Sequence, residues 1–321
     1  MQIRHFFLIF VGNMKKRTSA GAWLVEVWLY LHGLLPLKYH YCWAGVIAWL
    51  LRDVFHYRSK VVLVNLSRSF PEKDYGEIQA IYKRFYRHLA TLVVEMIWFS
   101  GCRGERGRRR FIRSGILRLS NTGEWNRISA ANPQRMVMYT HMGNWELLGG
   151  IGQTSPDVPL DASVSQFVVV FLNLRSQMWN QVMEWVRTGP VCDQPFRGYV
   201  EAGDILRFVL RHRHEPFHYL FNTDQAPYLN SGSMTVEFLH QECRSMTGAA
   251  ALACKLDMAA VYMRFLRREE GGYALTVVPL EDHAGATDPE SLMKRYYQLL
   301  EEDLRQQPWN YLWTHRRWKK Y

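Results

Sequence analysis

The sequence predicts an α/β domain built on a mixed, largely parallel sheet flanked by helices, preceded by an N-terminal membrane-associated helical segment. Short β-type runs alternate with helical patterns through the last two thirds of the 321 residues. Two apolar stretches dominate the N-terminal part, and the 48% hydrophobic content is ample for a packed core. We therefore expect an anchoring helical segment over residues 1–57 and an α/β domain over residues 58–321.

The N-terminal segment has apolar stretches at residues 20–37 and 42–51, rich in Trp and Tyr and preceded by Lys15, Lys16 and Arg17. Trp and Tyr favour bilayer interfaces, and Lys and Arg favour the cytoplasmic side. The first stretch is close to the ~20 apolar residues that span a bilayer but contains Glu26. It either spans with tilt or lies in the interface plane, and an ordinary buried helix pair is the alternative.

No cleaved signal peptide is expected, because no small-residue cleavage site separates the two apolar stretches. The run that begins at Met14 is typical of a translation start.

A long amphipathic helix is predicted over residues 75–100, where apolar residues recur at helical spacing. The basic, glycine-rich residues 103–110 predict a solvated loop. Expected strands then lie at 136–140, 164–171, 217–221, 234–239, 259–265 and 273–278. Expected helices lie at 145–151, 176–187, 201–211, 248–256 and 289–306.

The most informative segment is residues 136–150, MVMYTHMGNWELLGG. A strand should end near His141, Gly143-Asn144 supplies turn chemistry, and Asn144 can cap a helix that begins at Trp145. This corner can fold the His141 imidazole toward Glu146. A carboxylate on one ring nitrogen fixes the tautomer and leaves the other nitrogen as a base. The alternative is that His141 merely ends a strand and Glu146 merely favours a helix start.

Two other histidine motifs carry less weight. His283 and Asp288 repeat the spacing in a polar loop, where Asp288 before Pro289 indicates a helix start. His214 and His218 satisfy H-E-x-x-H, but Pro216 between them opposes the helix that zinc binding needs. The sequence contains no G-x-S-x-G elbow, P-loop or dinucleotide fingerprint.

HMGNWE (141–146) resembles the signature H-[FYM]-G-N-W-[ED] of the bacterial lipid A biosynthesis (lauroyl/myristoyl) acyltransferases, within the lysophospholipid acyltransferase-like superfamily. Further stretches are similar in the same order, so the resemblance covers almost the whole chain. They are RSKVVLVNLSRSFPEK (58–73), FYRHLATLVVEMI (85–97), TDQAP (223–227), MTG (246–248) and YLWTHRRWK (311–319).

The resemblance implies that His141 is the general base and Glu146 its orienting partner. It implies an acyl thioester donor, acyl carrier protein or CoA, and a hydroxyl of a phosphorylated glucosamine lipid, a lipid A precursor, as acceptor. No metal or other cofactor is implied, and the catalytic domain would lie at the cytoplasmic face of the bacterial inner membrane. Candidate substrate-binding residues are Gly143, Asn144, Arg175, Arg187, Asp224 and Gln225.

One departure concerns residues 170–174 (VFLNL), where the family commonly has V-Y-[KR]-P-L. Leu172 takes the basic position, and Arg175 could substitute for it. An acceptor that is another glycolipid, an amino lipid or a phospholipid therefore stays open, as does a catalytically silent membrane-binding homologue.

The net charge of +11 indicates an anionic partner. The basic and aromatic C-terminal residues 309–320 either contact anionic headgroups and phosphates or close the sheet as a packed tail. Nucleic-acid binding is disfavoured because no nucleic-acid fold signature accompanies them. The five scattered cysteines form no C-x-x-C pair and fit a reducing compartment without disulfides.

Overall fold

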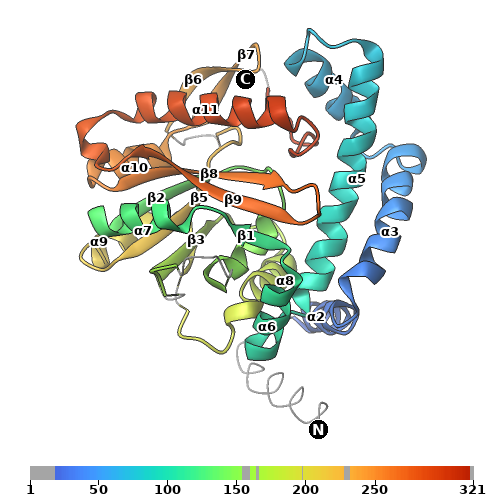
Figure 1. The fold of residues 1–321 in the computed structure, drawn as a ribbon, viewed down its shortest axis with the longest axis horizontal. Helices are drawn as coiled ribbons and strands as arrows, with labels where there is room; N and C mark the ends of the chain where they lie inside the picture. Colours follow the sequence, from blue (N-terminus) through green and yellow to red (C-terminus); the bar gives the residue numbers. More distant parts are fainter. Residues whose placement is uncertain (1–18, 154–159, 164–165, 197, 228–231, 319–321) are drawn as a thin grey trace.

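The computed structural model describes residues 19–153, 160–163, 166–196, 198–227 and 232–318. A seven-stranded sheet forms the centre of the molecule, and the long helix α5 (Tyr75–Ser100) passes along one end of it (Figure 1). The predicted α/β class with a mixed, largely parallel sheet is confirmed.

The strand order is β1-β9-β8-β2-β5-β3-β4, and each neighbouring pair is parallel except β8 with β9. All six residues of β2 are buried, as expected for a central strand of a sheet covered on both faces. The strands are β1 (Leu117–Leu119), β2 (Gln134–Tyr139), β3 (Phe167–Phe171), β4 (Tyr199–Glu201), β5 (Phe217–Asn222), β8 (Ala259–Arg267) and β9 (Tyr273–Glu281). A separate antiparallel hairpin joins β6 (Ser233–Phe238) and β7 (Gln241–Met246).

Helices cover both faces of the sheet. On one face, Trp125 of α7 (Thr122–Ala131) lies with Val261 and Val277. On the other, Tyr262 donates a hydrogen bond of 2.8 Å to Asp303 of α11 (Pro289–Gln306). The remaining helices beside the sheet are α8 (Gln177–Arg187), α9 (Ile205–Arg211), α10 (Gly248–Lys255) and the short 3₁₀ helices Gly189–Val191 and Ala284–Ala286.

The prediction of a solvated loop at residues 103–110 is wrong, because α6 (Gly104–Ser114) forms there. Its side chains make tertiary contacts that composition does not reveal. Phe111 is buried, Arg108 donates to the Pro190 carbonyl at 2.9 Å, and Arg110 donates to the Gly33 carbonyl at 2.6 Å. These contacts supply the order that a basic, glycine-rich segment lacks by itself.

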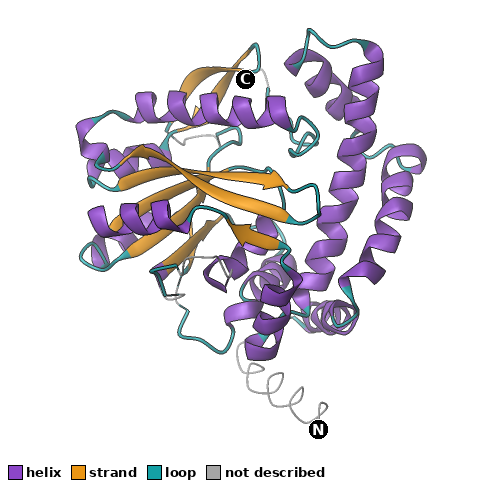
Figure 2. Cartoon of the chain, in the orientation of Figure 1, coloured by secondary structure: helices purple, strands orange, loops and turns teal. Residues whose placement is uncertain are grey.

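The N-terminal part consists of α2 (Ala20–Gly33), α3 (Leu37–Trp49) with a π-helical extension (Leu50–Val54), and α4 (Ser59–Ser69). Helix α3 lies on the side of α5 away from the sheet (Figure 2). The inner face of this pair is fastened to α5: Ser100 donates to the Leu29 carbonyl at 2.7 Å, and Tyr41 donates to Glu95 at 2.8 Å.

The outer face of α2 and α3 exposes large apolar side chains. They are Trp23, Leu24, Trp28, Leu31, Leu34, Tyr39, Trp43, Val46 and Trp49. In the part of the chain that the structure describes, no single helix has the length and apolarity to cross a membrane. The bent pair Ala20–Gly33 and Leu37–Val54, at 114°, meets that requirement by length and composition. The basic residues 15–17 lie outside the described residues, and membrane association of residues 1–57 stays a prediction.

Candidate active site

The carboxyl ends of β2 and β5 bring together His141 and Asp224. These neighbouring strands are parallel, and Tyr139 pairs with Asn222 in their register. Two residues beyond that pair, His141 Nδ1 lies 2.7 Å from Asp224 Oδ1, and the His141 backbone N–H donates to Asp224 Oδ2 at 3.0 Å. Sheet register therefore places a carboxylate against the imidazole from a segment 83 residues away along the chain.

Asp224 lies in a closed environment, with its side chain 1% exposed against 14% for His141. Burial raises the pKa of Asp224, but the charge of His141, hydrogen bonds from its ring and backbone, and the Tyr311 hydroxyl outweigh burial. The pKa of Asp224 therefore falls below its usual value. An ionised carboxylate only accepts hydrogen bonds, so Nδ1 carries a proton, and in the neutral ring Nε2 presents a lone pair.

The predicted pairing of Glu146 with His141 is wrong. Glu146 instead receives two hydrogen bonds from Arg187, Nε at 2.7 Å and Nη2 at 2.8 Å, and one from the Trp145 indole at 3.0 Å. The Trp145 ring also meets the His141 ring edge-on, with centroids 4.9 Å apart. Because the planar guanidinium of Arg187 matches both carboxylate oxygens, Glu146 turns toward the end of α8 and away from the imidazole.

The backbone conformation and packing at Gly143 require a glycine at this position of the signature. Its φ is +63°, and a Cβ there would lie 1.5 Å from a ring carbon of Phe265. Its N–H donates to the Asn310 side chain at 3.0 Å, and Met142 forms a β-bridge with Tyr311. Gly143 is thus required for the loop to pass the Phe265 ring, and no Cβ-bearing residue fits.

Asn144 anchors the same loop to α5. Its side-chain amide donates to Glu95 at 2.9 Å instead of capping the helix that follows, which is a 3₁₀ helix (Trp145–Gln153). Glu95 is fully buried and also accepts from Tyr41 and Tyr273, each at 2.8 Å. Burial raises the pKa of Glu95. Sequence reasoning missed Glu95, although a carboxylate on an otherwise apolar stretch of helix was a usable signal.

Gln225 reaches the other side of the imidazole, with its amide nitrogen 2.9 Å from His141 Nε2. Of the candidate residues, Asp224 and Gln225 thus contact His141 directly. Gly143 and Asn144 are buried and shape the loop. Arg175 is exposed beyond the end of β3, together with Leu172 and Leu174, and makes no described hydrogen bond or ion pair with the site.

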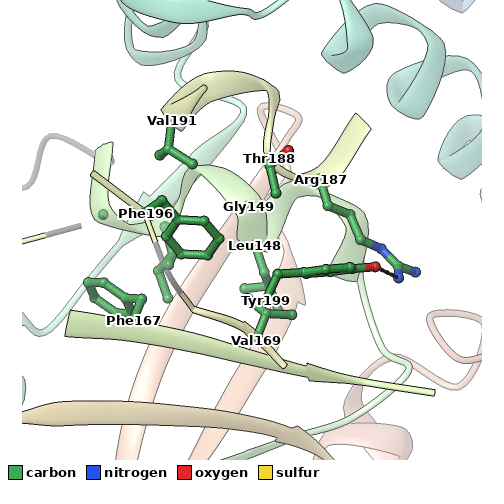
Figure 3. A pocket seen from close by; sticks show the side chains of 11 residues that line it. Leu148, Gly149, Phe167, Val169, Arg187, Thr188, Val191, Phe196 and Tyr199 are labelled. Carbon is green, nitrogen blue, oxygen red and sulfur yellow. Dashed lines mark hydrogen bonds between the residues drawn. The ribbon is translucent and has the colours of Figure 1, made fainter. Parts of the chain in front are cut away.

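A small apolar pocket lies beside the Glu146–Arg187 pair. Arg187 also donates to the Tyr199 hydroxyl at 3.1 Å, at one edge of this pocket (Figure 3). The cavity volume is about 20 Å³, room for about one water molecule. Its apolar lining comes from Leu148, Ile151, Phe167, Val169, Val191 and Phe196.

The weaker motifs have structural explanations. Asp288 caps α11 through the Glu290 and Ser291 N–H groups, as its sequence context predicts. His218 lies inside β5, buried against Phe167 and hydrogen-bonded to Arg135. Among the described residues, no group of three His, Cys, Asp or Glu side chains is placed to hold a metal ion.

The C-terminal basic and aromatic residues pack against the domain over their described part. Trp313 and Arg317 are buried, and Arg317 donates to the Tyr297 hydroxyl at 2.7 Å and to the Arg244 carbonyl at 2.6 Å. This supports the packed-tail alternative for these two side chains. Residues 319–320 lie outside the described residues.

Comparison with known proteins identifies the family of the chain. The family model of the bacterial lipid A biosynthesis acyltransferases matches residues 10–320. The chain is 25% identical over 305 residues to the lipid A biosynthesis palmitoleoyltransferase of Escherichia coli (strain K12), covering 91% of this chain and 88% of that protein. A lipid A biosynthesis acyltransferase of Shigella flexneri shows the same identity and coverage. The chain is thus an enzyme of the bacterial lipid A biosynthesis acyltransferase family.

Proposed function

We propose that this acyltransferase moves a fatty acyl chain from an acyl thioester to a hydroxyl of a lipid A precursor, with His141 as general base. The observation that carries the mechanism is the contact between His141 Nδ1 and the buried Asp224 carboxylate. Membership of the family and the names of the two relatives support a lipid A acceptor.

The chemistry follows from the protonation of the His141–Asp224 pair. The acceptor hydroxyl gives its proton to Nε2 while its oxygen bonds to the thioester carbonyl carbon. The tetrahedral intermediate then breaks its C–S bond, and the departing thiolate takes the proton back from Nε2. Asp224 stabilises the intervening imidazolium through Nδ1–H. General base catalysis of this kind typically contributes a rate factor of ~10²–10⁴.

Glu146 has a positioning role in this proposal. It holds Arg187 at the edge of the apolar pocket, where the Tyr199 hydroxyl completes the contact. A cavity of about 20 Å³ takes no more than a water molecule, so binding of a fatty acyl chain there requires the lining side chains to move apart. The donor, an acyl carrier protein or CoA thioester, would place its carbonyl near Nε2 with the chain directed into this pocket.

The outer face of α2 and α3 supports a location at the inner membrane. Its exposed Trp, Tyr and Leu side chains suit the bilayer interface, and the chain's net charge of +11 suits an anionic leaflet. The active-site domain would then work at the cytoplasmic face, where acyl thioesters are made.

The test is mass spectrometry of lipid A from a host that lacks its own late acyltransferase, with and without the full chain. A gain of one fatty acyl mass that disappears with His141→Ala is the expected result. Substantial transfer by well-folded His141→Ala would remove His141 as the base.

Leu172, 45% exposed where the family commonly has a basic residue, favours a second candidate acceptor with less anionic character. Profiling of all acylated lipids from the same cells separates the two. A new acylated glycolipid, amino lipid or phospholipid with unchanged lipid A would select this second acceptor. Membrane-bound protein with no acylated product at all would identify a silent homologue.

A further inference from the structure

The lone pair of His141 Nε2 is already occupied in this structure. Asp224 fixes the proton on Nδ1, so Nε2 is the acceptor nitrogen of the ring. The amide nitrogen of Gln225 lies 2.9 Å from it and can only donate. Two consecutive residues after β5 therefore hold the two nitrogens of one imidazole, one as acceptor and one as donor.

An imidazole nitrogen has one in-plane lone pair, so it accepts one well-aligned hydrogen bond at a time. A hydroxyl that is to be deprotonated must take the place that the Gln225 amide fills. We propose that Gln225 caps the base in the resting enzyme and that the acceptor hydroxyl displaces the amide when the lipid binds. The displacement step rests on the proposed function, whereas the cap itself does not.

The surroundings restrict which group can move. The imidazole is fixed by the Nδ1 hydrogen bond to Asp224 and by the edge of the Trp145 ring, and the His141 backbone N–H is bonded to the same carboxylate. Gln225 is half-buried, and its side chain has three rotatable bonds. Swinging the amide aside is therefore easier than moving the ring. The cap makes Gln225 a positioning residue that keeps other donors, water included, from Nε2 until a hydroxyl of the acceptor arrives.

The cap is tested by the rate at which diethyl pyrocarbonate modifies His141, read by mass spectrometry of the peptide that contains it. Carbethoxylation needs a free imidazole lone pair and no turnover. His283, whose side chain is 59% exposed, is the internal reference in the same sample. The variants are Gln225→Met, which keeps the side-chain length without an N–H, and Gln225→Glu, which keeps the shape but accepts where Gln donates.

Gln225→Met should speed modification of His141 roughly two- to ten-fold relative to His283, from the usual net contribution of one hydrogen bond. Gln225→Glu should slow it, because the carboxylate favours a proton on Nε2. Unchanged modification in Gln225→Met would overturn the cap. Faster modification in Gln225→Ala but not in Gln225→Met would also overturn it. That result would show that the Gln225 side chain only blocks access of the reagent to His141 and does not bind the lone pair.

Kinetics with the lipid acceptor test the displacement. Removing the cap should lower the KM for the acceptor in Gln225→Met by roughly two- to ten-fold while kcat changes less. Equal KM values for Gln225→Met and wild type would contradict competition between Gln225 and the acceptor. If wild type transfers nothing to a lipid A precursor while the Gln225 variants still change His141 modification, the acceptor assignment fails and the cap stands.

Discussion

Replacing Asp224 by Asn should inactivate the enzyme while leaving the fold intact. Both carboxylate oxygens of Asp224 accept N–H groups of His141, one from the ring at 2.7 Å and one from the backbone at 3.0 Å. An asparagine has one oxygen and one NH₂ group for these two donors. Whichever N–H meets the oxygen, the other meets an amide donor.

If the asparagine oxygen takes the backbone N–H, its NH₂ group faces Nδ1 and drives the ring proton to Nε2. The base then has no lone pair where the hydroxyl must bind. In the Ser-His-Asp enzymes, the corresponding Asp to Asn change lowers kcat by about 10⁴ through this tautomer effect. We expect Asp224→Asn to lower kcat by roughly 10²–10⁴, the range that general base catalysis spans.

The assay is single-turnover acyl transfer by purified full-length protein, with thermal unfolding as the check on folding. Glu146→Gln is the matched control, because Glu146 contacts Arg187 and not the imidazole. Its kcat should fall by less than about ten-fold. Because His141 and Asp224 act as a unit, the double variant His141→Ala/Asp224→Asn should be no slower than His141→Ala. An active Asp224→Asn together with an inactive Glu146→Gln would refute Asp224 as the orienting group.

Three further predictions concern the loop, the pH dependence and the membrane face. In thermal unfolding, Gly143→Ala should lower the stability of the fold by more than the ~1–2 kcal/mol that a positive φ costs by itself, because the new Cβ would meet the Phe265 ring. The control is Gly45→Ala in α3, which has open space around it and should be neutral or stabilising in the same measurement. The lowered pKa of Asp224 stabilises the fold above the usual carboxyl range, and this contribution disappears as pH falls through the folded-state value. Denaturant unfolding should therefore show wild type losing more stability than Asp224→Asn on acidification, and equal losses would contradict the ionised pair. The double change Trp28→Glu/Trp43→Glu should weaken binding to anionic vesicles about ten-fold or more, and Tyr75→Glu at the exposed start of α5 is the control that should not.

The sequence predicted most accurately the helices whose first residues include a capping side chain. Asp74 caps the start of α5 and forms a capping box with Glu77, and Asp288 caps the start of α11 just before Pro289. Both helices have the predicted bounds of 75–100 and 289–306. Helix α6 has no such sequence signals, and it is stabilised by contacts with residues distant along the chain. Arg110, for example, stacks on Trp98 of α5 with 5.0 Å from the guanidinium carbon to the ring centroid.

The partner of His141 was predicted wrongly because the choice was made along the chain. Glu146 is five residues away, and Asp224 is 83 residues away. Asp224 becomes adjacent only when β5 is known to lie beside β2 in parallel, with Tyr139 opposite Asn222. The predicted strands 136–140 and 217–221 end at different offsets from the two residues, so their spacing gave no hint of this pairing.

Three of the separate stretches that resemble the family meet in space at residues 141–146. Stretch 85–97 supplies Glu95, which holds Asn144, and stretch 223–227 supplies Asp224 and Gln225, which hold His141. Stretch 311–319 begins at Tyr311, whose β-bridge to Met142 fixes the loop from the side of the C-terminus.

Each of these contacts constrains a different atom of one small loop. The Gly143 backbone, the Asn144 amide, the His141 ring and the Glu146 carboxylate are fixed by four separate parts of the chain. A base that must lie within about 0.5 Å of its productive position toward the acceptor hydroxyl needs such independent supports. Stretches 85–97, 223–227 and 311–319 thus supply parts of one supporting network around His141, and loss of any one support should act on transfer through the position of that ring.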